Sequence, residues 1–211
     1  MVLGKRGLAG PMARWLHVAV HVGVPLSLLV LIAQVVLGRL SFDPIRDVEL
    51  RTGRTALNLL VLSLACTPLA LVTGWRAIRG LRRPLGLYAA LYAGLHFLVF
   101  AAWDYGLQFD LIWLDLRGNR FLQVGLPALV ILAALAVTSL RPLIRRMGRL
   151  WKWLHRLAYA AGLLAALHFY WAVKVDRRVP ILYGAIVVLL LVLRLPPVVG
   201  AVHKLRERVS A

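Results

Sequence analysis

Six long runs of mainly apolar residues, separated by short charged segments, dominate this chain. A helix needs about 20 such residues to cross the roughly 30 Å of hydrocarbon in a bilayer. Apolar residues make up 61% of the sequence and charged residues only 16%, which excludes a soluble globular domain. We therefore predict an all-α integral membrane protein, a single domain over residues 1–211 built as a bundle of about six transmembrane helices, at approximately 15–38, 55–74, 85–103, 121–140, 152–172 and 179–195.

The segments between these spans are too short for a soluble catalytic or nucleotide-binding domain, and they contain no glycine-rich phosphate loop. Electrons from a soluble reductant must therefore reach the chain through a partner. Cys66, the only cysteine, sits inside an apolar run, so a disulfide framework and a thiolate metal site are excluded. Lys5, Arg6 and Arg14 precede the first run, a pattern that predicts an uncleaved signal anchor.

The net charge of +18 is distributed unevenly between the two sides of the predicted bundle. Of the 26 Lys and Arg residues, 17 fall on the side of the two termini, together with one of the eight acidic residues. The connections on the other side hold the remaining nine basic and seven acidic residues. The positive-inside rule then predicts that both termini face the cytoplasm. The basic charge is a topology signal, and we expect no nucleic-acid binding.

Two histidines lie deep inside the predicted spans, where polar side chains are costly and commonly functional. His96 stands about 11 residues into the third span and His168 about 16 residues into the fifth. At 1.5 Å per residue, both fall in the outer half of the membrane. Imidazoles at matched depth on two helices can ligate haem iron from opposite faces of a porphyrin. Ordinary small-residue helix packing is the alternative explanation for the alanines and glycines around them.

A second, inner redox site is also considered. His155 lies 13 residues before His168, roughly 20 Å nearer the cytoplasm on a continuous helix. On such a helix the two rings are about 220° apart, so they do not share one face unless the helix is kinked or bulged. His21, at a similar depth in the first span, is the natural partner to consider for His155.

Several segments, in this order and at these loop positions, resemble the MsrQ (formerly YedZ) family, within the ferric reductase and NADPH oxidase-like transmembrane superfamily. The resemblance covers nearly the whole chain, and the segments that carry it are Asp43-Pro44-Ile45-Arg46-Asp47, Thr52-Gly53-Arg54-Thr55-Ala56-Leu57, Arg83-Pro84-Leu85-Gly86-Leu87, Leu95-His96, Leu154-His155-Arg156 and His168-Phe169-Tyr170-Trp171-Ala172-Val173-Lys174.

The resemblance implies a ferric reductase-like transmembrane domain in the bacterial inner membrane, with b-type haem and FMN as cofactors. It implies that His96, His155 and His168 match the family's haem-associated histidines. Larger members of the superfamily carry a second histidine on the third helix, whereas here that inner position falls near Arg82 and Arg83.

Two arginines are candidates for holding an acidic cofactor group, because guanidinium forms paired hydrogen bonds to carboxylate and phosphate. Arg83 could pair with a haem propionate or an FMN phosphate, and the alternative is an ordinary loop charge on the cytoplasmic side. Arg54, with Thr52, could hold a propionate or contact a partner, although a Thr-Gly pair before a helix is commonly only a cap.

The expected function is electron transfer, without catalysis of substrate reduction by this chain. A cytoplasmic flavin reductase or the quinol pool is the expected donor. The resemblance implies a periplasmic molybdopterin methionine sulfoxide reductase as the acceptor, which repairs oxidised envelope proteins. The alternatives are a stand-alone ferric or quinone reductase cytochrome b, and a small transporter or membrane scaffold whose buried histidines relay protons.

Overall fold

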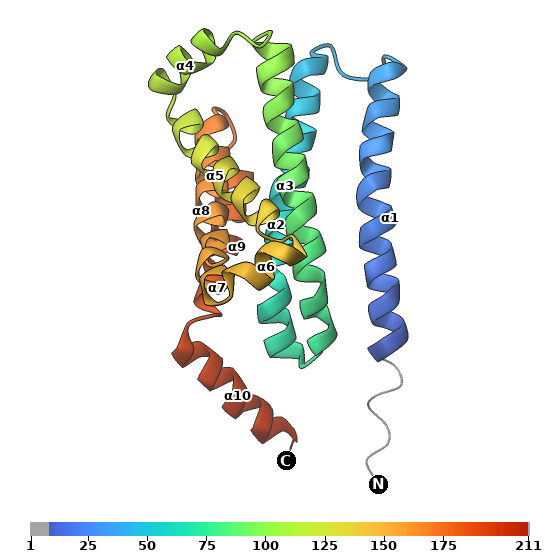
Figure 1. The fold of residues 1–211 in the computed structure, drawn as a ribbon, viewed down its shortest axis with the longest axis vertical. Coiled ribbons are helices and arrows are strands. Elements are labelled where there is room, and N and C mark those ends of the chain that lie inside the picture. Colours follow the sequence, from blue (N-terminus) through green and yellow to red (C-terminus); the bar gives the residue numbers. More distant parts are fainter. Residues whose placement is uncertain (1–8, 211) are drawn as a thin grey trace.

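The computed structural model describes residues 9–210, and within that range the chain is built of helices joined by short turns. The long helices lie side by side along one axis, and the start of α1 and helix α10 lie at the same end (Figure 1). The elements are α1 (Ala9–Val36), α2 (Pro44–Thr73), the 3-10 helix η1 (Arg76–Leu81), α3 (Arg82–Val99), the π-helical turn η2 (Phe100–Asp104), α4 (Phe109–Gly118), α5 (Arg120–Val137), α6 (Arg141–Met147), α7 (Arg149–Leu154), α8 (Leu157–Ala172), α9 (Arg178–Val192) and α10 (Pro196–Ser210).

Several helices are long and apolar enough to cross a membrane, which confirms the multi-pass membrane fold. Among the described residues there are four such segments: Met12–Val36, Pro44–Thr73, Arg76–Asp104 and Arg120–Val137. A fifth results if α9 and the start of α10, bent by 77° against each other, form one span. Helix α8 has 16 residues, an axial length of about 24 Å. The count of six spans and the cytoplasmic termini therefore stay predictions.

Helix α2 begins at Pro44 rather than at residue 55, because a local capping signal precedes its polar first turns. The Asp43 side chain accepts a hydrogen bond from the Arg46 backbone N–H at 3.1 Å. Proline at the first helical position adds a φ angle already suited to a helix. The other end is closed by Gly74, whose φ of 73° is left-handed. As a result, the segment from Glu49 to Gly53 is helical and packs along α3.

The predicted fifth span, residues 152–172, is interrupted near its first residues. Helix α7 ends at Leu154 and α8 begins at Leu157, so His155 lies in the turn between them. The His155 and Arg156 backbone N–H groups bond to the carbonyls of Trp151 and Trp153, each at 3.0 Å, which closes α7. The expected rotation of about 220° between His155 and His168 assumed one straight helix. That assumption is wrong.

Two helix pairs form the centre of the bundle. Helix α2 packs mainly against α3, and α5 packs mainly against α8. Contacts of α3 with α5 and of α2 with α8 join the two pairs, and α9 packs against α8. Ala89 on α3 and Ala161 on α8 are completely buried, which allows close approach of the helices around them. Cys66 is buried and its thiol bonds to the Leu62 carbonyl at 3.2 Å, as a packing residue.

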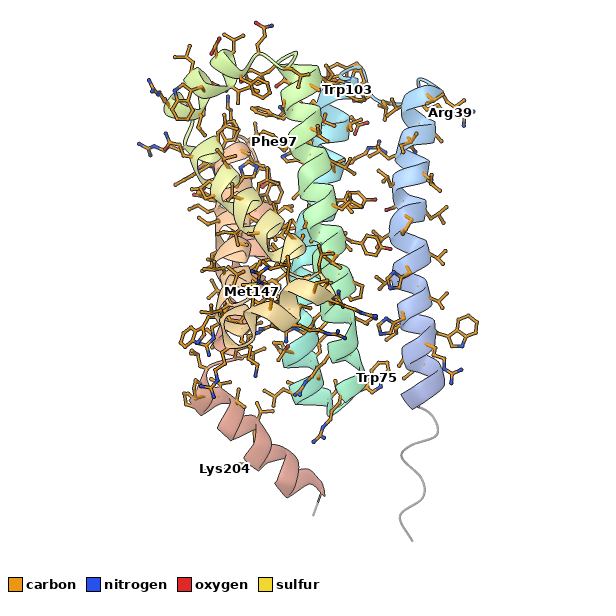
Figure 2. The ribbon with its side chains drawn as sticks, in the orientation of Figure 1. Arg39, Trp75, Phe97, Trp103, Met147 and Lys204 are labelled. Carbon is orange, nitrogen blue, oxygen red and sulfur yellow. The ribbon has the colours of Figure 1, made fainter. Side chains whose placement is uncertain are left out.

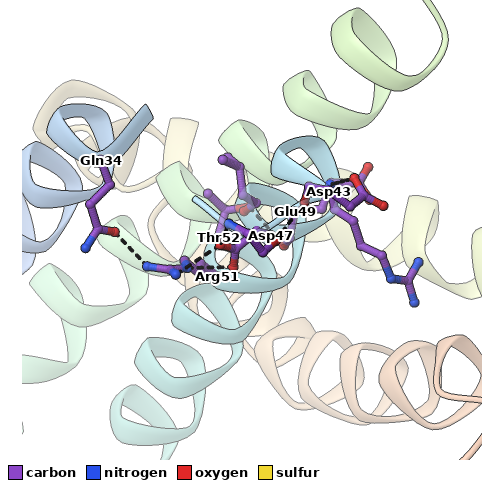
Figure 3. Close-up of polar contacts among 9 residues, drawn as sticks. Gln34, Asp43, Asp47, Glu49, Arg51 and Thr52 are labelled. Carbon is purple, nitrogen blue, oxygen red and sulfur yellow. Dashed lines mark hydrogen bonds and ion pairs between the residues drawn. The ribbon is translucent and has the colours of Figure 1, made fainter. Parts of the chain in front are cut away.

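Helix α1 lies at the edge of the bundle and contacts η1 and α3 (Figure 1). Near its outer end it is connected to α2 through Arg51, which donates to Gln34 at 2.7 Å and pairs with Asp47 at 2.7 Å (Figure 3). Farther along, Ser27 and Tyr92 share a hydrogen bond of 2.7 Å. Most other side chains of α1 are exposed, as expected for a surface in contact with lipid.

Tryptophans mark both ends of the α2–α3 hairpin. Trp75 lies at one end and Trp103 at the other (Figure 2). Such a distribution is expected where aromatic rings sit at the two headgroup regions of a bilayer.

Candidate functional site

The structure brings the two deeply placed histidines together. His96 from α3 and His168 from α8 have ring centres 6.1 Å apart and ring planes at 79°. Both side chains lie in the interior between the two helix pairs. They come from helices on opposite sides of the bundle centre, so each ring reaches towards the other.

The same backbone contact orients each ring. His96 Nδ1 donates to the carbonyl of Glu49 on α2 at 3.0 Å, and His168 Nδ1 donates to the carbonyl of Phe121 on α5 at 2.8 Å. A carbonyl can only accept, so Nδ1 carries the hydrogen in both rings. Nε2 of each ring is then left with its lone pair, the form in which neutral imidazole binds a metal ion.

A glycine lies against each histidine ring. A Cβ atom on Gly53 of α2 would lie 3.1 Å from His96 Nδ1, and a Cβ atom on Gly125 of α5 would lie 2.5 Å from His168 Nδ1. The second distance is shorter than any real contact of this kind, so no side chain fits there without moving the ring. Both glycines therefore create the space in which the imidazoles reach their carbonyl partners.

Thr52 contacts the same backbone carbonyl as His96. It is almost completely buried, and its hydroxyl donates to the carbonyls of Val48 at 2.7 Å and Glu49 at 3.1 Å (Figure 3). The Glu49 carbonyl thus accepts from both Thr52 and His96. This places Thr52 beside the carbonyl that anchors the His96 ring.

The distance between the His96 and His168 rings leaves room for one metal ion that both imidazoles would hold. An imidazole nitrogen lies about 2.0 Å from a first-row metal ion that it ligates, and the ring centre lies about 1.2 Å further away. Two such rings on opposite sides of one ion have centres roughly 6.3 Å apart, against the 6.1 Å observed. Among the described residues no group of three or more His, Cys, Asp or Glu side chains could hold a metal ion. A porphyrin needs only the two imidazoles, because it supplies the other four nitrogens itself.

The parallel between the two halves of the site is also present in the sequence. Leu-His-Phe occurs at His96 and again at His168, and each histidine lies 47 residues after its carbonyl partner. Gly53 and Gly125 are likewise each four residues after that carbonyl. The two hairpins are thus similar segments offset by 72 residues. This repeat is the signal that could have identified Gly53 and Gly125, which sequence analysis missed.

The inner candidates form a different network. Arg83 donates to the Ser139 carbonyl at 2.6 Å, and the Ser139 hydroxyl lies 3.3 Å from His155 Nε2. His155 Nδ1 contacts the Trp151 carbonyl at 3.1 Å, and the two rings stack with centres 3.9 Å apart. Trp151 in turn donates to the Thr138 carbonyl at 3.0 Å. Arg83 and Trp151 therefore satisfy the terminal carbonyls of α5, which have no partner within the helix.

The remaining candidates, His21 and Arg54, lie neither at the His96–His168 pair nor at His155. His21 Nδ1 lies 3.1 Å from the Tyr88 hydroxyl, and its ring stacks on His17. No hydrogen bond or ring contact joins His21 to His155, so the structure does not support that pairing. Arg54 is exposed on α2, and no polar partner is found for it among the described residues.

The contact between Arg83 and Ser139 allows a test of the role of Arg83. We expect Arg83→Gln to lower the melting temperature by a few degrees, since a hydrogen bond from a charged group contributes about 1.5–3 kcal/mol when well shielded and less at an exposed position. Haem content should be unchanged. Circular dichroism melting together with haem absorbance measures both. Loss of haem with an unchanged melting temperature would instead assign Arg83 to a cofactor.

Comparison with known proteins identifies the family of this chain. Residues 52–166 match the family described as the ferric reductase like transmembrane component. The chain is 44% identical over 154 residues to the protein-methionine-sulfoxide reductase heme-binding subunit MsrQ of Bordetella pertussis, covering 72% of this chain and 75% of that one. It is 42% identical over 163 residues to the protein of the same name from Xanthomonas campestris pv. campestris, covering 72% and 70%. The chain therefore belongs to the MsrQ family of ferric reductase-like membrane proteins.

Proposed function

We propose that this chain carries electrons across the bacterial inner membrane through one b-type haem held by His96 and His168. Membership of the MsrQ family supports a membrane electron-transfer role, and the names of the relatives specify haem binding. The observation that carries the residue assignment is the pair of imidazoles, each anchored through Nδ1 and separated by 6.1 Å.

When bound, the haem iron supplies reversible one-electron oxidation and reduction. The contribution of this chain is to hold the two rings and to keep their Nε2 atoms unprotonated. Glu49 and Phe121 provide the carbonyls that fix the ring orientation. If His96 and His168 both ligated the iron, they would leave it no open position for oxygen or substrate, which would favour electron transfer over bond-making chemistry.

The electron acceptor is proposed to be a periplasmic molybdopterin methionine sulfoxide reductase that repairs oxidised envelope proteins. The relatives are named as subunits of a protein-methionine-sulfoxide reductase, which supports an acceptor of that class. His96 and His168 lie in the half of the bundle that the charge distribution assigns to the periplasmic side. An electron leaving this site has a short path to a protein docked there.

FMN is proposed as a second cofactor, and a cytoplasmic flavin reductase or the quinol pool as the donor. The excess of arginine at the cytoplasmic ends of the helices is suitable for a phosphate group. His155 and Arg83 already have partners within the chain, so we assign iron ligation only to His96 and His168.

An absorption spectrum tests the proposal directly. The purified full-length chain should show a haem band that sharpens on reduction with dithionite, with about one haem per chain. Stopped-flow mixing of the reduced chain with the periplasmic reductase and a methionine sulfoxide substrate should reoxidise the haem. A chain without a reducible haem band rules the proposal out. A haem that ferric ions or quinones reoxidise, but the reductase does not, would favour a stand-alone reductase.

A further inference from the structure

A cavity of about 300 Å³ opens at the predicted cytoplasmic end of the bundle, away from the histidine pair. It is formed by the last turns of α2, by η1 and the start of α3, by α8, and by the bend between α9 and α10. Three arginines line it, Arg79, Arg82 and Arg194, together with Thr67. None of these side chains belongs to the histidine pair or to the carbonyls that anchor it.

Arg194 is held in place by a defect in α2. Pro68 lies inside that helix and has no N–H, so the carbonyl of Leu64, four residues earlier, lacks its usual helical partner. Arg194 fills this gap by donating from Nη2 to the Leu64 carbonyl. From Nη1 it donates to the Tyr159 hydroxyl at 2.7 Å, and its guanidinium carbon lies 4.8 Å from the Tyr159 ring centre. The guanidinium is therefore fixed before any ligand arrives.

Two polar atoms at this cavity are buried without a partner, Arg194 Nε and Thr67 Oγ1. Both can donate a hydrogen bond, and a buried donor without an acceptor destabilises the folded chain. Their presence at one cavity indicates that an acceptor from outside the chain completes the site.

The charge at the cavity is also unbalanced. Arg79 and Arg82 are exposed, and neither they nor Arg194 form an ion pair within the described part of the chain. The sequence contains no Asp or Glu between Arg51 and Trp103 or between Leu116 and Val175. Three guanidinium groups that converge without an acid repel each other, so an anion bound between them stabilises the arrangement.

The surroundings of the cavity identify the kind of anion. Apolar side chains beside it point outward from α2 and from the α9–α10 bend, among them Leu69, Val72 and Leu195, each about half exposed. This is the surface that lipid chains cover. Basic pockets between helices on the cytoplasmic side commonly bind anionic lipid headgroups. We propose that the cavity binds the phosphate of an anionic phospholipid from the cytoplasmic leaflet.

Lipid retention by the full-length chain tests the proposal. The chain is reconstituted in nanodiscs of equal parts phosphatidylglycerol and phosphatidylcholine, then released and analysed by native mass spectrometry. The wild-type chain should retain phosphatidylglycerol in preference. Each arginine near a membrane surface contributes about 1 kcal/mol, or roughly fivefold. The Arg79→Gln/Arg82→Gln double variant should therefore retain about 25-fold less, and these exposed side chains can be changed without disturbing the core.

Two further variants make the result specific. Thr67→Val removes the buried hydroxyl at nearly constant volume and should also weaken retention. Arg145→Gln neutralises an exposed arginine on α6 outside the cavity and should retain lipid as the wild type does. Equal retention of the two lipids by the wild-type chain, or an equal loss in Arg145→Gln, overturns the proposal. Displacement of the lipid by FMN but not by riboflavin, which lacks the phosphate, would assign the cavity to a nucleotide and also overturn it.

Discussion

Replacing either His96 or His168 with alanine is expected to remove nearly all haem from the purified chain. In the proposed site each ring is the only protein ligand on its side of the iron, and no group of three or more possible metal ligands is found among the described residues. Loss of a residue that merely orients a metal ligand already costs about 10- to 100-fold in affinity. Loss of the ligand itself should exceed that. The haem-to-protein ratio, measured by pyridine haemochrome absorbance, should fall from about one to below about a tenth.

His17→Ala is the matched control, since it removes an imidazole from α1 that stacks on His21 and lies away from the pair. It should keep the wild-type haem content and spectrum. If His96→Ala or His168→Ala kept a full complement of haem with the wild-type reduced spectrum, the assignment of the ligands would be wrong. A parallel loss of folding is recognised by circular dichroism and by size-exclusion elution.

Gly125→Ala is expected to have the second largest effect, although it adds only one methyl group. The new Cβ would lie 2.5 Å from His168 Nδ1, so the ring must move away from the Phe121 carbonyl that orients it. Overpacking of a tight interior typically costs about 1–3 kcal/mol. At 1.4 kcal/mol per factor of ten, haem affinity should fall by about 5- to 150-fold. Haem titration of the apo-chain, followed by absorbance, measures this loss.

Other glycines of the chain provide a graded series of controls. Gly53→Ala places its Cβ 3.1 Å from His96 Nδ1 and should produce a smaller loss, because a shift of a few tenths of an ångström relieves the contact. Gly94→Ala and Gly184→Ala meet no atom within 4 Å and should bind haem as the wild type does. Haem affinity is therefore expected to rise from Gly125→Ala through Gly53→Ala to the two controls. Equal affinity of Gly125→Ala and Gly94→Ala would contradict the role of the glycine.

The helical membrane fold could be predicted from the sequence because apolar run length is a direct requirement of the bilayer. The helix boundaries were harder to predict from the sequence. Helix α2 begins at Pro44 because Asp43 caps it, and the polar residues of its first turns do not match the apolar pattern by which spans are recognised. The break at His155 depends on Trp151 and Arg83 satisfying the end of α5, a contact between distant parts of the chain.

The candidate site shows the same division. Helical rise alone placed His96 and His168 at similar depths, and the structure brings them together. Depth does not determine which residues surround a ring, so the carbonyls of Glu49 and Phe121 and the two glycines were missed. Pairing His155 with His21 likewise rested on depth alone. The structure does not support this pairing, because α1 lies at the edge of the bundle and His21 contacts Tyr88 there.

The repeat of one hairpin within the chain has a consequence for how such a site can arise. Residues 85–97 and 157–169 share seven of 13 positions, including both Leu-His-Phe segments. Helices α2 and α5 run in one direction and α3 and α8 in the other, so the two helix pairs have the same orientation along the bundle (Figure 1). This is the relationship expected after duplication of an ancestral gene segment. A lone hairpin offers one imidazole, and a second copy completes the pair. At the inner positions the same offset of 72 residues pairs Arg83 with His155, so there the two segments differ.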